Sequence, residues 1–264
     1  MPKKKSRKKS RPRKKVVSKK SRPRKKIKLE SLNDQTEFVI KTKPEWIKAS
    51  LASKATYQKK YKESIKNNDG FWKKEGKRIT WIRPYKKIKD VKYSNTDVKI
   101  KWFHDGTLNA SANCVDRHLK DKKDKTAIIW VGDDPKDSQK ISYKQLHQKI
   151  SRAANGLKKL GIQKGDRVTI YLTMIPELAV LMLACARIGA IHSIIFGGFS
   201  ADSISGRVND CKSEYIITAD EGVRGGKTIP LKATTDEALL NCPNVKKCIV
   251  VKRTGNEIEW NDHR

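Results

Sequence analysis

The sequence predicts an α/β protein built on a doubly wound, mostly parallel sheet. From Lys125 onward, short apolar runs alternate with segments of helical periodicity. Runs that begin near residues 167, 192, 214 and 247 are spaced for helical crossovers between parallel strands. The runs are continuously apolar, as in strands that are covered on both faces. In sheets of this kind, ligands bind at the carboxyl ends of the strands.

Five strands and four helices follow along the chain. The strands are expected at residues 126–132, 167–172, 192–197, 214–220 and 247–253. Helices are expected at residues 143–160, at 201–211, at 235–240 and from Pro176 through the run ELAVLMLACARIG. The helix at Pro176 is apolar all round and is therefore expected to be buried.

The helix that starts at Tyr143 has clear boundaries. Ser142 is expected to cap it, and Gly161 is expected to end it. Its apolar residues recur at the spacing of one helical face. That face consists of Leu146, Ile150, Ala153, Leu157 and Leu160.

The chain divides into three predicted regions, at residues 1–28, 29–124 and 125–264, of which the last is the α/β region. Residues 29–124 begin as a polar, lysine-rich stretch with scattered aromatic side chains. We expect short helices there, broken at 67–70, that wrap a core lying elsewhere. Nearer its end, Asn109, Asn113 and Asp116 predict a buried polar network that fixes the path of the chain.

Positive charge is concentrated at the N-terminus. Residues 1–28 carry seventeen Lys or Arg and no acid, in a chain of net charge +33. The motif KKSRPRKK occurs twice there, at 8–15 and 19–26. Its prolines, its self-repulsion and its lack of apolar residues predict a disordered arm.

Such an arm is suited to nucleic acid or another polyanion, because each cation displaces counterions from phosphate. The candidate contacts are Arg11, Arg13, Arg22 and Arg24. The same pattern is typical of a nuclear localisation signal. The alternative is a solvated tail with only non-specific attraction for anions.

The remaining composition argues against several classes of protein. No apolar run reaches about 18 residues, so no membrane span is expected. The N-terminus lacks the apolar core of a secretory signal. The five cysteines are odd in number and have no CxxC spacing, which predicts reduced, buried thiols without a metal site or disulfide framework. A cytoplasmic protein is therefore expected, with a nuclear location left open.

Two glycine-containing loops follow predicted strands. Phe196-Gly197-Gly198 allows close approach of a ligand, although a turn followed by Ser200 as a helix cap explains the same residues. His118 and His192 are isolated and favour a structural role. The sequence contains no nucleophile elbow, HExxH motif or GxGxxG motif, and no catalytic residue is assigned.

The second loop is the stretch DEGVRGGK, in which Arg224 and Lys227 flank Gly225 and Gly226. The glycines remove side chains that would block a ligand. Arg224 can hold a phosphate bidentately, and Lys227 can add a point charge. The preceding acids, Asp220 and Glu221, would orient or neutralise these cations. A plain surface turn is the alternative, and the GxxxxGK[ST] pattern of a Walker A loop is absent.

Three long stretches together resemble a known family. They are IKWFHDGTLNASANCVDRHL, the run from KGDRVTIYL to SGRVNDC, and IITADEGVRGGKTIPLK, at 100–119, 164–211 and 216–232. They are similar to the AMP-forming acetyl-CoA synthetases, members of the superfamily of adenylate-forming acyl-CoA ligases. The resemblance extends from about residue 57 to residue 264. Propionyl-CoA synthetases are the nearest relatives that could be confused with it.

The resemblance implies the parallel sheets of the family's large N-terminal domain. It implies formation of an acyl adenylate from a carboxylate, ATP and Mg²⁺, and then thioester formation with coenzyme A. The implied coenzyme A site comprises Phe196, Gly197, Gly198, Arg224, Gly225, Gly226 and Lys227. Lys227 replaces an arginine of the family, which keeps the charge and loses the bidentate fork.

The resemblance also implies that the ATP phosphate loop, the acyl pocket and the C-terminal domain correspond to sequence beyond Arg264. We therefore expect an N-terminal segment of an acetate–CoA ligase that contributes part of the coenzyme A site and is catalytically incomplete by itself. The alternative is a degenerate ligase fragment that binds polyanions through its basic arm. The choice between acetate and propionate, and the oligomeric state, stay open.

We expect residues 1–28 to account for any binding of nucleic acid by the chain. The affinity for a labelled DNA duplex, measured by fluorescence anisotropy, should fall steeply between about 50 and 200 mM salt. Deletion of residues 1–28 should abolish the binding. Binding that survives the deletion, or that is insensitive to salt, would contradict this assignment.

Overall fold

The computed structural model describes residues 41–260. The chain divides into two compact units, with the boundary after Gln58. The predicted basic arm and its four candidate arginines lie outside the described residues. In the first unit, the described part contains α1 (Pro44–Ala49) and the start of α2 (Lys54–Lys66). Proline opens α1, where a missing amide hydrogen costs nothing.

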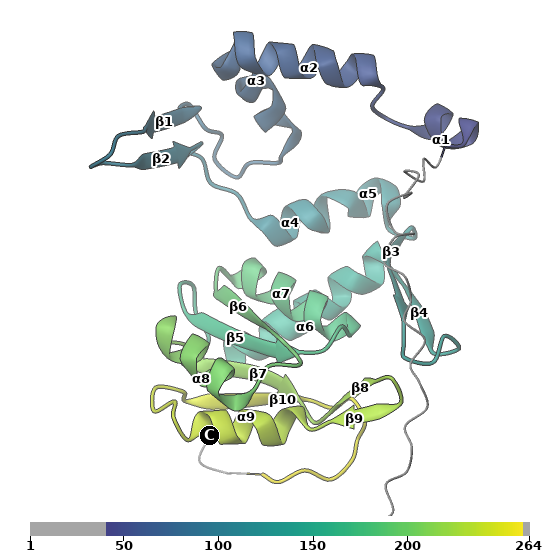
Figure 1. The fold of residues 1–264 in the computed structure, drawn as a ribbon, viewed down its shortest axis with the longest axis vertical. Coiled ribbons are helices and arrows are strands. Elements are labelled where there is room, and N and C mark those ends of the chain that lie inside the picture. The colour runs from purple at the N-terminus through teal and green to yellow at the C-terminus, as the bar shows by residue number, and fades with distance from the viewer. Residues whose placement is uncertain (1–40, 261–264) are drawn as a thin grey trace, which may run out of the picture. The chain divides into compact units, whose positions relative to one another are not determined.

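The centre of the second unit is a sheet of four parallel strands (Figure 1). Their order is β10 (Lys247–Val251), β7 (Tyr215–Ala219), β5 (Arg167–Leu172) and β6 (Ile191–Phe196). The four strands that the spacing predicted to be parallel are therefore confirmed.

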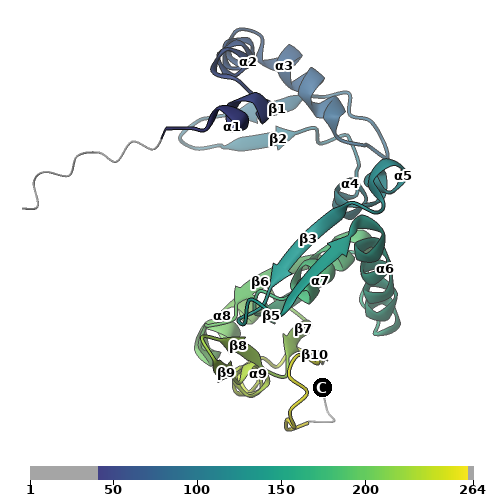
Figure 2. The ribbon, with the colours of Figure 1, turned by 90° about the vertical axis from the view of Figure 1, so that its right-hand side faces the viewer.

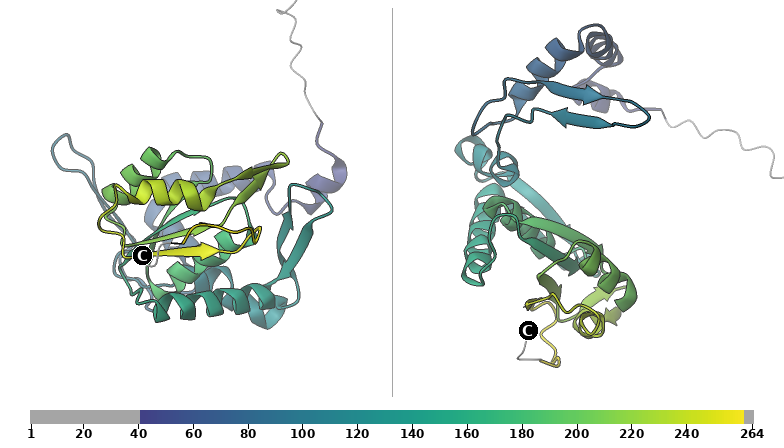
Figure 3. Two further views of the ribbon diagram at one scale, coloured as in Figure 1. Left: turned by 90° about the horizontal axis from the view of Figure 1, so that it is seen from below. Right: turned by 90° about the vertical axis from the view of Figure 1, so that its left-hand side faces the viewer.

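Helices cover both faces of this sheet (Figure 3, left). On one face lie α6 (Tyr143–Lys159) and α7 (Pro176–Ile188), which pack against each other. On the other lie α8 (Ala201–Asp210) and α9 (Leu231–Leu239). The doubly wound architecture is confirmed.

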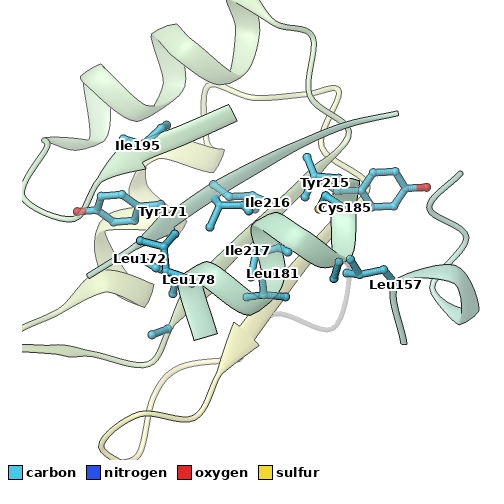
Figure 4. Packing of buried hydrophobic residues seen from close by; sticks show 14 of the residues in the cluster. Leu157, Tyr171, Leu172, Leu178, Leu181, Cys185, Ile195, Tyr215, Ile216 and Ile217 are labelled. Atoms are coloured by element: carbon cyan, nitrogen blue, oxygen red, sulfur yellow. The ribbon is translucent and has the colours of Figure 1, made fainter. Parts of the chain in front are cut away.

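The core is continuous through the central strands (Figure 4). Ile216 and Ile217 are neighbours on β7 and therefore point to opposite faces, yet both are 0% exposed. Burial of each such side chain stabilises the fold by roughly 1.5–3 kcal/mol. The apolar character of α7 on all sides follows from its position between the sheet, α6 and α4 (Ala110–Cys114).

Two helices differ in detail from the predictions. In α6, the Ser142 cap is present, but Ala154 is buried more deeply than Ala153, and Leu160 is 37% exposed because it follows the last helical turn. The helix expected at 235–240 begins earlier, at Leu231. Thr235 fits inside it because its hydroxyl donates to the Leu231 carbonyl at 2.8 Å.

Three antiparallel hairpins were not predicted. They are β1 (Lys89–Lys92) with β2 (Lys99–Trp102), β3 (Thr126–Val131) with β4 (Ser138–Ser142), and β8 (Gly222–Arg224) with β9 (Lys227–Ile229). The strand expected at 126–132 exists as β3, but it pairs with β4 and not with the parallel sheet (Figure 2). β4 is mostly polar and buries only Ile141, so it lacks an apolar run that would announce it.

The break predicted at 67–70 is confined to Asn67, because Asn68 to Gly70 form the first turn of α3 (Asn68–Glu75), which follows α2. The Asn67 side chain caps α3 by accepting from the Gly70 amide at 3.1 Å. Short helical segments follow at η2 (Gly76–Arg78), η3 (Asp116–His118) and α5 (Leu119–Lys122).

The polar side chains at 109–116 join the start of α4 to the end of α7. Asn109 accepts from the Ala112 amide at 3.0 Å and donates to the carbonyls of Ala186 and Arg187 at 3.0 and 3.1 Å. It therefore caps the start of α4 and the end of α7 together. The network that was predicted to be buried is half-buried, because its surroundings are short surface helices.

Asp116 adds a charged contact to the same junction. Its carboxylate accepts two hydrogen bonds from the Arg187 guanidinium, both at 2.8 Å. This contact, against a smaller opposing effect of burial, lowers the pKa of Asp116. Asn113 completes the network by bonding both backbone groups of Thr80.

All five cysteines are free thiols. Burial raises the pKa of Cys185 and of Cys248 to about 11, so both stay protonated at neutral pH. Cys114 is exposed, unlike the buried thiols that were predicted. Within residues 41–260, the helices lack the combination of length and apolar composition needed to cross a bilayer.

Asn109→Ala should lower the free energy of unfolding by about 1–3 kcal/mol, since it removes a helix cap and two donors at once. Asn109→Ser keeps an acceptor at the cap without setting a carboxylate against the Ala186 and Arg187 carbonyls, and should lose less. Asn244→Ala, at an exposed asparagine, should change stability by less than about 0.5 kcal/mol. Urea denaturation measures all three variants, and equal losses for Asn109→Ala and Asn244→Ala would contradict the double-cap role.

Candidate functional site

A cavity of about 660 Å³ opens at the carboxyl ends of β5 and β6. Its walls are mainly apolar and include Leu172, Ile194 and Phe196. Two guanidinium groups, those of Arg224 and Arg253, also line it. The position matches the rule that ligands bind at the carboxyl edge of a parallel sheet.

Both loops that the sequence singled out reach this cavity. Phe196, Gly197 and Gly198 extend from the end of β6, and Arg224 comes from β8. Gly225, Gly226 and Lys227 are not among the lining residues. The structure therefore places four of the seven predicted coenzyme A residues at the cavity and the other three at the adjoining hairpin tip.

The stretch around Gly225 and Gly226 is a two-residue hairpin turn between β8 and β9, with Arg224 paired to Lys227. The φ angles of the glycines are +59° and +70°. A Cβ on either would meet no atom within 4 Å. Positive φ at both positions, as in a type I′ turn, is therefore what requires glycine.

The hairpin tip holds a carboxylate. The amides of Gly225 and Gly226 donate to the two oxygens of Asp133, each at 2.7 Å. These two bonds, from Gly226 and then Gly225, lower the pKa of Asp133. The tip is therefore joined to the turn of the β3–β4 hairpin.

Gly197 and Gly222 allow close packing under the cavity. A Cβ on Gly222 would lie 2.6 Å from the Thr173 methyl carbon, and one on Gly197 would lie 3.2 Å from the Leu172 backbone. Both glycines are needed because the loops after β5, β6 and β7 approach one another. The turn-and-cap interpretation of the loop at 197–200 also holds, because Ser200 caps α8.

The acids before the hairpin do not bind its cations. Asp220 is 3% exposed and accepts from the amides of Arg253, Thr254 and Gly255. Glu221 accepts from the Thr254 hydroxyl and the Asn256 amide group. Burial raises the pKa of Asp220, but the amide donors outweigh it and leave the pKa lowered. The two acids organise the loop after β10.

Sequence reasoning missed three residues at this site. Trp130 lines the cavity, donates from Nε1 to the Met174 carbonyl at 2.8 Å, and lies 5.2 Å from the Arg253 guanidinium. Arg253 ends a strand that was predicted, so the rule about carboxyl ends could have found it. Trp130 and Asp133 could not be found in that way, since the β3–β4 hairpin lies outside the parallel sheet.

The cavity is suited to an anionic ligand with an apolar body. Within residues 41–260, the Arg224 guanidinium makes no hydrogen bond or ion pair, so its donors face solvent. Arg253 has one longer contact, at 3.5 Å, to Asp137.

His192 is half-buried, and burial lowers its pKa, which favours the neutral, structural imidazole that was predicted. Residues 41–260 contain no cluster of three or more His, Cys, Asp or Glu that could hold a metal ion.

Gly222→Ala should lower stability by about 1–3 kcal/mol, because its methyl group overlaps Thr173. Thr173→Ser removes the opposing methyl and should restore part of the loss in the double variant. Gly206→Ala, in an open position of α8, should raise stability by up to about 1 kcal/mol. Thermal and urea unfolding test this prediction, which fails if Thr173→Ser gives no restoration.

Comparison with known proteins places the chain in a family. The family described as AMP-binding enzyme matches residues 115–263. A second family, described as acetyl-coenzyme A synthetase N-terminus, matches residues 57–114. Acetyl-coenzyme A synthetase of Parvibaculum lavamentivorans is 58% identical over 214 residues, which cover 81% of this chain and 33% of that protein. Acetyl-coenzyme A synthetase 1 of Pseudomonas aeruginosa is 54% identical over 223 residues, covering 84% and 34%.

The fold is also found in a solved structure. Acetoacetyl-CoA synthetase from Streptomyces lividans superposes with a TM-score of 0.68 at 25% identity, over 76% of this chain and 30% of that one. The chain spans about a third of the length of the relatives it matches. It belongs to the family of AMP-binding enzymes and is similar to the N-terminal part of acetyl-coenzyme A synthetases.

Proposed function

We propose that this chain supplies part of the coenzyme A site of an AMP-forming acetate–CoA ligase. The observation that carries the proposal is the meeting of the loop at Phe196 with Arg224 at one cavity. Both loops are expected at the coenzyme A site on the resemblance to acetyl-CoA synthetases. The names of the most similar relatives agree with that substrate.

Arg224 is the proposed main contact for a coenzyme A phosphate. A guanidinium binds phosphate bidentately, and this one has no competing partner within residues 41–260. Lys227 pairs with it across the hairpin and adds a second positive charge. Phe196 is 56% exposed at the cavity, so its ring offers an apolar surface to the rest of the ligand.

The other substrates are proposed from the resemblance to the family, because no residue described here is assigned to bind them. Acetate, ATP and Mg²⁺ are the proposed partners of the complete reaction, on the resemblance to acetyl-CoA synthetases. No residue among 41–260 is given a catalytic or magnesium-binding role. This segment would bind and orient one substrate, while the adenylation chemistry requires the remainder of the family's sequence.

We also propose a cytoplasmic location and a separate polyanion-binding role for the basic arm. The expected cytoplasmic location suits the free thiols of the chain. Binding of polyanions by Arg11, Arg13, Arg22 and Arg24 rests on the sequence repeat alone. We keep it as a separate proposal, which the deletion of residues 1–28 decides.

Arg224→Ala should weaken coenzyme A binding tenfold to hundredfold, since a charge-assisted contact contributes roughly 1.5–3 kcal/mol. A chimera provides the assay: residues 57–264 replace the matching region of the Parvibaculum lavamentivorans enzyme. The Michaelis constant for coenzyme A should rise by that factor. Acetate-dependent ATP–pyrophosphate exchange should stay nearly unchanged, because exchange precedes the entry of coenzyme A.

Lys227→Arg is the matched variant and should be neutral or tighten coenzyme A binding, because it adds the bidentate fork. Lys140→Ala, at an exposed lysine of β4, controls for the loss of one positive charge. A chimera in which Arg224→Ala impairs the exchange reaction and leaves coenzyme A affinity intact would show that the hairpin is structural.

A further inference from the structure

Asp133 contacts the tip of the β8–β9 hairpin, where Gly225 and Gly226 lie 92 and 93 residues later in the chain. Each carboxylate oxygen accepts one amide, both at 2.7 Å. Bonds of this length are typical of donors to an ionised acceptor. The geometry is that of an anion held by two adjacent backbone amides.

The amides are available because of the turn. In a two-residue hairpin, the flanking residues Arg224 and Lys227 form the last pair of the ladder. The glycine amides at the tip lie outside that ladder and need another acceptor. Asp133 satisfies both donors at once, which neither a lysine nor a neutral apolar residue at that position can do.

The carboxylate is itself held in place. It follows β3, and the Gly132 amide donates to the Asp137 carbonyl at 2.6 Å across the turn of that hairpin. The bond from Trp130 Nε1 to the Met174 carbonyl fixes β3 against the loop after β5. Asp133 therefore extends from a frame that is anchored to the central sheet.

The strand pair that carries Arg224 is held at its tip by Asp133. β8 and β9 form their own two-stranded sheet and do not join the parallel one. Asp133 and Arg224 line the same cavity, from opposite hairpins. Fixing the tip thus fixes the main chain from which the Arg224 side chain extends to the cavity.

We infer that Asp133 is a positioning residue, which binds the Gly225 and Gly226 amides and thereby holds Arg224 at the cavity. Its role in ligand binding rests on the proposed coenzyme A function, whereas its effect on the hairpin does not. Asp133 acts on the ligand only through the hairpin, and Arg224 makes the contact. The competing possibility is that the ligand displaces Asp133 from the amides.

Selective labelling tests the hairpin directly in this chain. Arg224-Gly225 is the only Arg-Gly step in the sequence, so ¹³C-carbonyl arginine with ¹⁵N-glycine identifies the Gly225 amide without further assignment. Asp133→Asn should move this signal upfield. It should also speed amide exchange about two- to fivefold, the range for an exposed charged pair.

Asp134→Asn is the matched control. It removes one negative charge from the neighbouring position, while its side-chain oxygen still accepts from the Lys136 amide. The Gly225 signal and its exchange rate should then stay at the wild-type values. Equal changes in the two variants, or no change in either, would overturn the inference.

The effect on the ligand is measured in the same chimera that tests Arg224. Asp133→Asn should raise the Michaelis constant for coenzyme A about two- to fivefold, and should have no further effect when Arg224→Ala is also present. Tighter coenzyme A binding in Asp133→Asn would show competition for the amides and overturn the inference. If Arg224→Ala leaves coenzyme A affinity unchanged, the proposed function fails, and the exchange result for Gly225 still stands by itself.

Discussion

The parallel pairing of β10, β7, β5 and β6 is the constraint on which the rest of the structure depends. Parallel strands place all their carboxyl ends at one edge, and crossovers must return along the faces as helices. Both consequences are visible here: four helices cover the two faces of the sheet, and the loops after β5 and β6 converge at one cavity. The same geometry explains why Gly197 and Gly222 lack side chains, since their loops meet Thr173 and its neighbour below the cavity.

Two acids at this edge bind backbone amides and do not pair with the guanidinium groups of Arg224 and Arg253. Asp133 accepts from the tip of the hairpin that carries Arg224, and Asp220 accepts from the amide of Arg253. A carboxylate that ion-paired with Arg224 would compete with an anionic ligand. Because these acids hold the main chain, they can order the loops while leaving the positive charge directed at the cavity.

The sequence predicted the elements that depend on local pattern. Strands with continuous apolar runs, the helix cap at Ser142 and the buried helix at Pro176 were all found within a few residues. β4, β8 and β9 were missed because their pairing partners stabilise them and their own composition does not. At the site, Arg224 and the loop at Phe196 could be predicted, whereas Trp130 and Asp133 could not, since only tertiary packing brings the β3–β4 hairpin to the cavity.

The role assigned to the two glycines of the hairpin changes accordingly. From sequence, they were expected to clear space for a ligand. In the structure, their positive φ angles shape a turn whose two glycine amides lie outside the ladder and donate to Asp133 of another hairpin. A glycine pair of this kind has a local requirement, the turn, and a long-range consequence, the pair of donors. The requirement can be deduced from two adjacent letters of sequence. The consequence depends on Asp133, which lies more than ninety residues earlier in the chain, and it links the shape of the turn to the placement of Arg224.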